Sequence, residues 1–398
     1  MTNKNKEQIW VMVLRIALAL LFIFSGLTKA IDPVDWGIKM DDYFTSFGMT
    51  FMHPFSFYIG FIPTIAEFLL GFMLLFRIKV KWTTLGYLIF MTFFFFLTLW
   101  LAVAEHLELN YGYDLGVVKD CGCFGQAIEM SNLQTFLKNV VIMIPTIIIF
   151  MKRKSIPDIK LTPLGSFLLA SIGAIMVFVF QLYCLFNLPI IDFTNWGKGD
   201  NVVDKFIDIP AQKEMVFLYQ NRLDTTQVMA LSENSMMTIE DKIPTFYEDY
   251  DYVDRKDSII SPSVSAEITG FNMLDKTGSD FASSYINKNK EIVYILFIHN
   301  LNDVSKKGIE SRALKTLIAD CQSKNIDFVA ITNDSDSLIS QFVKKYNITF
   351  PIYQNPIDPI KGPFMVRDAV RSNPGLMVIE KGVIADKWSW RNFPNKVQ

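Results

Sequence analysis

Two of the four cysteines in this chain flank a single glycine, in the stretch DCGCFG at positions 120–125. A disulfide between cysteines this close would form a small, strained ring, and strain makes a disulfide easier to reduce. Cys121 and Cys123 therefore leave three hypotheses open: a structural disulfide, a redox-active pair that exchanges with a partner or a quinone, or two ligands of a soft metal ion. Since the chain has only three histidines to complete a ligand set, we predict no metal site.

Two further residues could take part in thiol chemistry. His106 follows the third long apolar segment and is a candidate to lower a thiol pKa, although a histidine there also fits an ordinary residue of the membrane interface. Cys184 lies about one turn from the end of the fifth apolar segment, so it is either a candidate third thiol or a small packing residue. If these residues are catalytic, the protein is a thiol–disulfide or quinone-linked oxidoreductase, but the sequence does not decide whether it is an enzyme.

The cysteine pair lies between apolar segments of a membrane protein. The chain has 398 residues, 35 of them phenylalanine, and nearly all its long apolar runs lie in residues 1–190. Five segments reach the roughly 20 residues that cross a bilayer, namely Ile9–Ala30, Phe55–Phe76, Trp82–Ala104, Leu133–Met151 and Leu164–Leu188. The first exceeds the roughly 7–15 apolar residues of a cleavable signal peptide, so we expect it to be retained.

Basic residues in the short connections predict the orientation of these spans. They gather at three places, with Lys4 and Lys6 first, then Arg77, Lys79 and Lys81, then Lys152, Arg153, Lys154 and Lys160. With five spans, all three groups fall on one side, which the positive-inside rule makes the cytoplasm. We therefore predict a bacterial inner-membrane protein with a cytoplasmic N-terminus and a periplasmic C-terminal domain. Both cysteines would then lie in an oxidising compartment, on the same side as the aromatic-rich loop 32–54, which is suited to an interfacial helix.

Three ionisable residues lie in or near the ends of the first two spans. Arg15 and Glu67 lie at similar depths when counted along their helices, so we predict an ion pair between them. This pair is either a structural clamp or part of a proton or quinone site. Lys29 lies near the opposite end of the first span, where its long side chain could reach the interface.

The first spans resemble the DoxX superfamily of small membrane proteins, on the evidence of Arg15, the stretch FSGLTK at 24–29, and Glu67 followed by Gly71. The DCGCFG loop is similar to that of the MauE-like branch, and the resemblance covers roughly residues 8–152. It implies a four-helix membrane bundle over 1–160, associated with redox or thiol–disulfide maturation of extracytoplasmic proteins. A fifth span over 161–190 and a long C-terminal region lie outside that core, a combination similar to DoxX family proteins of Bacteroidetes.

The region after the spans divides in two. Residues 191–263 predict a small β-rich connector, with a hairpin around Met215–Tyr219 and Thr226–Leu231. From 264 to 398, strands and helices alternate and end in a hairpin, which predicts an α/β sandwich. The strands are expected over 291–299, 327–332, 351–353, 375–380 and 383–388, and the helices over 306–324 and 335–346.

This order of elements resembles the thioredoxin fold, closest to its TlpA-like and peroxiredoxin-like members. The resemblance implies that Pro374, after Asn373, stands where that family has a cis proline. The family's Cys-x-x-Cys would fall in 299–305, and no thiol is present there. The helical spacing of Cys321 places it on the side of its helix that faces the domain core, where a thiol is generally inert. The expected extracytoplasmic domain therefore lacks dithiol chemistry of its own and is suited to binding or docking.

Two functions follow from these observations. The first is thiol–disulfide or electron-transfer chemistry through the Cys121-Gly122-Cys123 loop, with a quinone as candidate cofactor and an extracytoplasmic thiol protein as candidate partner. The second is a non-enzymatic subunit of a cell-envelope complex, with structural cysteines and a docking domain. Membrane lipids are partners in either case. A net charge of -2 without a basic stripe argues against nucleic acid.

Overall fold

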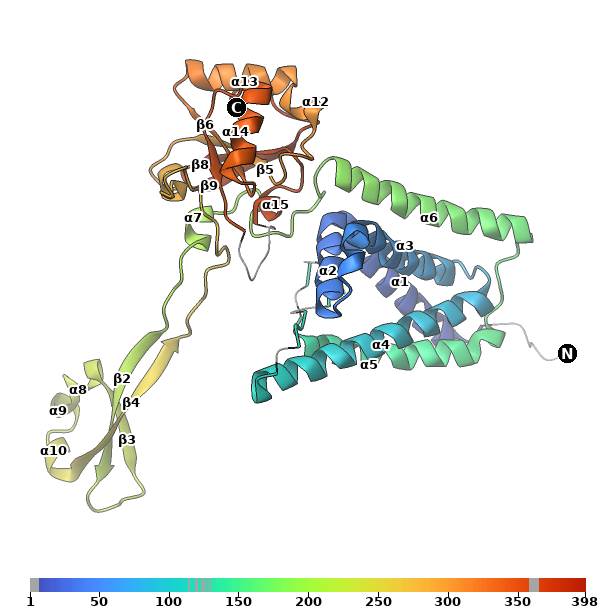
Figure 1. The fold of residues 1–398 in the computed structure, drawn as a ribbon. Coiled ribbons are helices and arrows are strands. Elements are labelled where there is room, and N and C mark those ends of the chain that lie inside the picture. The colour runs from blue at the N-terminus through green and yellow to red at the C-terminus, as the bar shows by residue number, and fades with distance from the viewer. Residues whose placement is uncertain are drawn as a thin grey trace.

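The computed structural model describes residues 7–113, 115–118, 121–122, 125, 127–128, 130–357 and 365–398. Figure 1 shows a helical bundle, an α/β domain beside one end of it, and a narrow arm that projects away from both. We call the second of these the C-terminal domain (residues 188–211 and 262–398) and the third the arm (residues 212–261). Most of the chemistry-bearing residues lie at the end of the bundle that meets the C-terminal domain.

The five predicted spans are confirmed as helices that are long and apolar enough to cross a membrane. They are α1 (Ile9–Ile31), α3 (Ser56–Leu75, preceded by the 3-10 turn η1, Thr50–Phe55), α4 (Val80–Tyr111), α5 (Asn132–Lys152, followed by η2, Arg153–Ser155) and α6 (Pro163–Phe186). Local sequence sets several ends. Ser131 and Gln134 form a capping box at the start of α5, and Gly112 ends α4 in a left-handed conformation.

Helices α1 and α3 pack with their backbones close together because glycines remove the side chains between them. A Cβ on Gly26 would lie 2.8 Å from the backbone nitrogen of Phe68, and one on Gly71 would lie 2.8 Å from the carbonyl oxygen of Ala19. These contacts leave no room for a larger residue at either position. They fix the register of the two helices and therefore decide which charged residues face each other.

The loop between α1 and α3 forms the predicted helix, α2 (Pro33–Ser46). Asp32 caps it by accepting a hydrogen bond from the backbone N–H of Asp35, and Pro33 supplies the first helical position. Helix α2 lies across the end of the bundle, between the spans and the C-terminal domain (Figure 1). We define the Cys loop as residues 112–131 between α4 and α5, and its described residues Val118, Cys121, Gly122 and Gly125 lie at the same end.

The C-terminal domain is built on a five-stranded sheet in the order β7-β6-β5-β8-β9. Strands β5 (Val293–Ile298), β6 (Asp327–Thr332) and β7 (Ile352–Gln354) are parallel, whereas β8 (Gly375–Glu380) and β9 (Val383–Ser389) are antiparallel. All five predicted strands are therefore confirmed. Residues of β5 alternate between two cores, with Ile295 on one face and Leu296 on the other.

Helices α13 (Arg312–Ser323) and α14 (Asp336–Tyr346) pack on one face of this sheet. The single helix expected over 306–324 is instead two, because Ser311 caps α13 after the short α12 (Lys306–Ile309). The other face is covered by α15 (Met365–Ala369), α11 (Ala282–Tyr285) and α7 (Val202–Lys205) with the nearby Trp196. Residues near 196–206, expected in the connector, thus belong to the core of the C-terminal domain.

The arm is a three-stranded antiparallel sheet in the order β3-β2-β4. It consists of β2 (Gln212–Asn221), β3 (Val228–Ser232) and β4 (Tyr250–Ser261), with short helices α8 (Glu233–Met236), α9 (Ile239–Lys242) and α10 (Phe246–Asp249) at its tip. The predicted hairpin is confirmed as β2 and β3. The arm has a small core of its own, made of Tyr219, Leu231, Ile239 and Phe246.

Candidate functional site around helix α2

Cys121 is buried where the Cys loop meets α2 and α4. It is 1% exposed and packs in a cluster with Tyr43, Leu101 and Val118. The hydroxyl of Tyr43 donates a long hydrogen bond of 3.5 Å to the Cys121 carbonyl oxygen. Cys123 lies outside the described residues, so the pairing of the two thiols stays a prediction.

Two glycines of the Cys loop lie against helices α1 and α2. Gly122 and Gly125 both have positive φ values, of 63° and 57°. A Cβ on Gly122 would lie 3.5 Å from the Lys39 side chain, and one on Gly125 would lie 3.5 Å from the Thr28 carbonyl oxygen. The loop therefore packs on α2 with one part and on the last turn of α1 with another.

The last turn of α1 carries the ion pair of the bundle. Lys29 and Glu67 are 3% and 8% exposed, and the Lys29 ammonium donates to the Glu67 carboxylate and, at 2.8 Å, to the Ser25 hydroxyl. The ammonium also lies 5.3 Å from the ring centroid of Trp36 on α2. Both expectations for these residues were wrong, because Lys29 is buried rather than extended to the interface and Glu67 pairs with it instead of with Arg15.

Arg15 is buried but belongs to the other end of the bundle. Its guanidinium pairs with Glu7 at 2.8 Å and donates to the carbonyl oxygens of Leu74 and Leu75, where α3 ends. The close contacts of Gly26 with Phe68 and of Gly71 with α1 place Arg15 level with residue 74 rather than with Glu67. Depth counted from the helix ends missed this register. Arg15 satisfies the last carbonyl groups of α3, which otherwise lack intrahelical partners.

Helix α2 presents two different faces to its surroundings. One face is turned to the Cys loop and the cluster around Cys121, and it consists of Trp36, Lys39, Met40 and Tyr43. A second set with the same helical spacing, Val34, Gly37, Ile38 and Asp41, lines a cleft on the side of the C-terminal domain. One helix thus separates the buried Cys121 from an open cleft.

The C-terminal domain is joined to the start of α2 by a buried ion pair. Arg371 donates to Asp32 at 2.8 Å and also pairs with Asp368, and the side chains of Arg371 and Asp32 are 4% and 8% exposed. These carboxylates hold the pKa of Arg371 above its usual value. Burial, together with the nearby charge of Asp32, raises the pKa of Asp35 to about 7.

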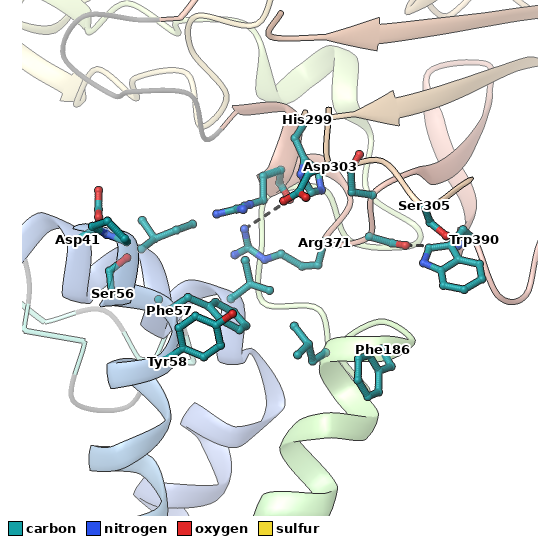
Figure 2. Close-up of a pocket in the computed structure, with 18 of the residues that line it drawn as sticks. Asp41, Ser56, Phe57, Tyr58, Phe186, His299, Asp303, Ser305, Arg371 and Trp390 are labelled. Atoms are coloured by element: carbon teal, nitrogen blue, oxygen red, sulfur yellow. Dashed lines mark hydrogen bonds between the residues drawn. The ribbon is translucent and has the colours of Figure 1, made fainter. Parts of the chain in front are cut away.

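The cleft beside α2 has a volume of about 680 Å³ and is formed by both bodies (Figure 2). Its floor consists of residues from α2, η1, α3 and the end of α6, and its opposite wall comes from the loops around His299 and Arg371 in the C-terminal domain. Burial lowers the pKa of His299 to about 3, so this ring is neutral at physiological pH. The Asn373–Pro374 peptide bond beside the cleft is cis.

The remaining predicted residues are not gathered around Cys121. His106 lies within α4, exposed, and contacts Asn110 and Tyr111 of the same helix. Cys184 is a buried free thiol on α6, which packs on α1, α2 and α3. Cys321 is fully buried in the core, as predicted, and burial raises its pKa to about 11. Within the described ranges, no three His, Cys, Asp or Glu side chains gather as metal ligands would.

The match to known proteins covers the N-terminal part of the site and neither α6 nor the C-terminal domain. Residues 7–152 match the model of the family described as methylamine utilisation protein MauE. This MauE match extends from the start of α1 to the end of α5 and includes the Cys loop, Lys29 and Glu67. The chain is a membrane protein with several apolar helices, and residues 7–152 are similar to the MauE family. No curated protein and no solved structure matches it significantly.

Sequence reasoning missed two features of the site. Arg371 follows Asp32 by 339 residues, and no periodicity or motif connects positions so far apart. The sequence shows only that Lys29 and Glu67 both lie in apolar helices. Predicting that they pair would also have required the register of α1 and α3.

Proposed function

We propose that this protein is a membrane-bound thiol–disulfide oxidoreductase in which Cys121 and Cys123 are the redox pair. The observation that carries the proposal is the position of the Cys loop, which packs on α1 at Thr28 and Lys29, directly beside the buried Lys29–Glu67 pair. Ionisable residues inside a membrane bundle are costly and usually functional. A purely structural disulfide would need no such pair beneath it.

The proposed reaction releases protons at this place. When Cys121 and Cys123 are oxidised, two S–H bonds break, one S–S bond forms, and two electrons and two protons leave. A quinone would accept both and become a quinol, or the disulfide of a partner thiol protein would accept them and become a dithiol. A cavity of about 30 Å³ lined by Ser25, Lys29 and Glu67 can hold a water molecule to receive a proton.

We assign the C-terminal domain to the thioredoxin-like folds and the whole chain to the bacterial inner membrane, with this domain in the periplasm. The parallel β7-β6-β5 strands, the antiparallel β8-β9 pair and the cis Asn373–Pro374 bond support the fold. The 299–305 loop, which has no cysteine, then contributes to the cleft and supplies no thiol. The domain would act by holding α2, which covers Cys121.

Thiol trapping tests the proposal in a background that leaves only the two cysteines of interest. The Cys184→Ala/Cys321→Ala variant, in intact membranes, is treated with a maleimide reagent after mild reduction and again after addition of a soluble quinone. We expect two labelled thiols in the first sample and none in the second, with Cys121→Ser as the matched control that cannot form the pair. A pair that stays oxidised under mild reduction, or stays reduced with quinone and with oxidised partner alike, would contradict the redox function.

A second function, a docking subunit of a cell-envelope complex, is favoured by one observation. The buried Arg371–Asp32 pair fixes the C-terminal domain on the bundle, and the arm projects away from both (Figure 1). The arm carries exposed side chains of both signs, among them Arg222 and Asp251. Deletion of residues 212–261 tests this function. Loss of co-purifying envelope proteins with unchanged thiol oxidation would support the docking role, and retention of the same partners would argue against it.

A further inference from the structure

The cleft between the bundle and the C-terminal domain is large enough for a ligand and has polar groups without partners. Its volume of about 680 Å³ lies within the range of about 300–1,000 Å³ that small-molecule sites occupy. Part of its lining comes from the start of α3 and the end of α6, where the apolar spans stop (Figure 2). A molecule bound here would therefore have one part at the membrane boundary and another against the C-terminal domain.

Hydrogen-bond donors without acceptors lie on the wall formed by the C-terminal domain. Arg371 is 7% exposed, and its Nη2 atom is buried without a hydrogen-bond partner among the described residues. The guanidinium of Arg367, in the same wall, has no carboxylate within ion-pair distance in the described part of the chain. A buried charged donor without an acceptor is costly, and a phosphate would accept from both guanidinium groups.

Carboxylates in the same cleft disfavour the binding of a simple anion. Asp41 accepts a hydrogen bond from the His53 ring at 2.7 Å, and Asp303 lies on the opposite side of the cleft (Figure 2). Both are close enough to Arg367 for their charges to act on it. A free phosphate dianion would be repelled by both carboxylates. A ligand that carries an ammonium group next to its phosphate would match both signs of charge.

Aromatic side chains at the membrane boundary provide an apolar surface for a tail. Phe57 and Tyr58 lie at the start of α3 and Phe186 at the end of α6, and all three line the cleft (Figure 2). Tyr58 is 70% exposed and Phe186 is 46% exposed. Aromatic rings at this depth are typical contacts of lipid chains near the head groups.

We propose that the cleft is a binding site for a zwitterionic phospholipid whose head group has a phosphate and a primary ammonium. Arg367 and Nη2 of Arg371 bind the phosphate, Asp303 and Asp41 accept from the ammonium, and the acyl chains begin along Tyr58 and Phe186. The lipid would then contact α2 on the face opposite Cys121 and join the bundle to the C-terminal domain. This site is independent of whether the cysteines are redox-active.

Native mass spectrometry of the full chain, purified in detergent and exchanged with lipids of identical acyl chains, tests the proposal. Phosphatidylethanolamine should remain bound at activation energies that remove phosphatidylcholine, which lacks N–H donors, and phosphatidylglycerol, which lacks the cation. Arg367→Gln should weaken its retention on the order of tenfold. The matched control is Arg222→Gln on the arm, which should leave retention unchanged. Soluble glycerophosphoethanolamine distinguishes a lipid site from a head-group site, because it should compete only weakly without the tails.

Asp303→Asn provides a second measurement that does not depend on the arginine. Removal of this carboxylate should shift the preference from phosphatidylethanolamine towards phosphatidylglycerol while total lipid binding persists. Equal retention of the three lipids by the unmodified protein, an unchanged preference in Asp303→Asn, or full competition by the soluble head group would overturn the proposal. A folded Arg367→Gln protein with unaltered retention would also overturn it.

Discussion

Replacing Arg371 with methionine should release the C-terminal domain from the bundle. The substitution keeps much of the side-chain length but removes every donor, so Asp32 is left buried at 6% exposure without its guanidinium. Breaking a buried ion pair by removing one partner typically costs about 3–5 kcal/mol. The pair joins two bodies that each have a core of their own, so the cost should fall on the equilibrium between the C-terminal domain docked on the bundle and released from it. We expect this equilibrium to shift towards the released state by more than about a hundredfold.

Hydrogen exchange of the α2 backbone, followed by mass spectrometry, measures this equilibrium in the full-length protein. We expect faster exchange in α2 and new protease cleavage between α6 and Trp196, while β5 and β6 keep their protection. The matched control is Arg222→Met, because Arg222 also pairs with an aspartate at 2.8 Å, but on the arm with both side chains at least half exposed. An exposed pair contributes less than about 1 kcal/mol.

The partner substitution makes the test quantitative. Adding Asp32→Asn to Arg371→Met should recover part of the lost docking, because the double variant no longer buries an uncompensated charge. The coupling energy between the two substitutions should exceed about 1.5 kcal/mol. If the two effects are simply additive, or if Arg371→Met leaves α2 exchange unchanged, then the ion pair does not hold the domain and the account of the junction is wrong.

Three further outcomes follow from the same structure. Burial raises the pKa of Asp35 to about 7 in the folded protein, whereas an exposed aspartate ionises near pH 4. The stability of the unmodified protein relative to Asp35→Asn should therefore fall as pH rises from about 4 to about 7 and stay constant above, and melting curves of both proteins over this pH range check it. The comparison cancels the opposite contribution of His299, which both proteins share. Lys29→Met should lower the melting temperature in detergent, because Glu67 is left buried without a cation at a cost of about 3–5 kcal/mol. Adding Glu67→Gln should restore much of the melting temperature, and equal melting of the single and double variants would contradict this. Gly71→Leu should also lower the melting temperature, because its side chain would meet the backbone of α1 at 2.8 Å, and an unchanged value would show that the helices can separate.

The spans could be predicted because crossing a bilayer needs a length of apolar sequence and little else. The strands of the C-terminal sheet could be predicted for a related reason, since each is buried on both faces and appears as a short apolar run. The arm strand β4 was missed because it has no buried face to produce such a pattern, and its residues Tyr250–Ser261 are mostly polar and exposed.

Which charges meet could not be predicted, because the answer depends on packing. Arg15 and Lys29 lie about four helical turns apart on α1. The close glycine contacts between α1 and α3 select the register in which Lys29 is the partner of Glu67. The helix expected in the aromatic-rich loop 32–54 is present as α2, and its location at the membrane interface stays a prediction. Nothing in the sequence of this loop indicated that Asp32 is buried against Arg371.

The position of α2 explains how a domain without a dithiol can be relevant to the cysteine pair. Trp36 and Tyr43 on one face of this helix pack around the Cys loop, and Asp32 at its start is held by Arg371 of the C-terminal domain. A helix of this length moves as a unit, so a displacement of its start also displaces the side chains that bury Cys121. We therefore expect access to the thiol and docking of the C-terminal domain to be coupled through α2. Arg371→Met should increase the maleimide labelling rate of Cys121 in the Cys184→Ala/Cys321→Ala background after mild reduction, and Arg222→Met should not.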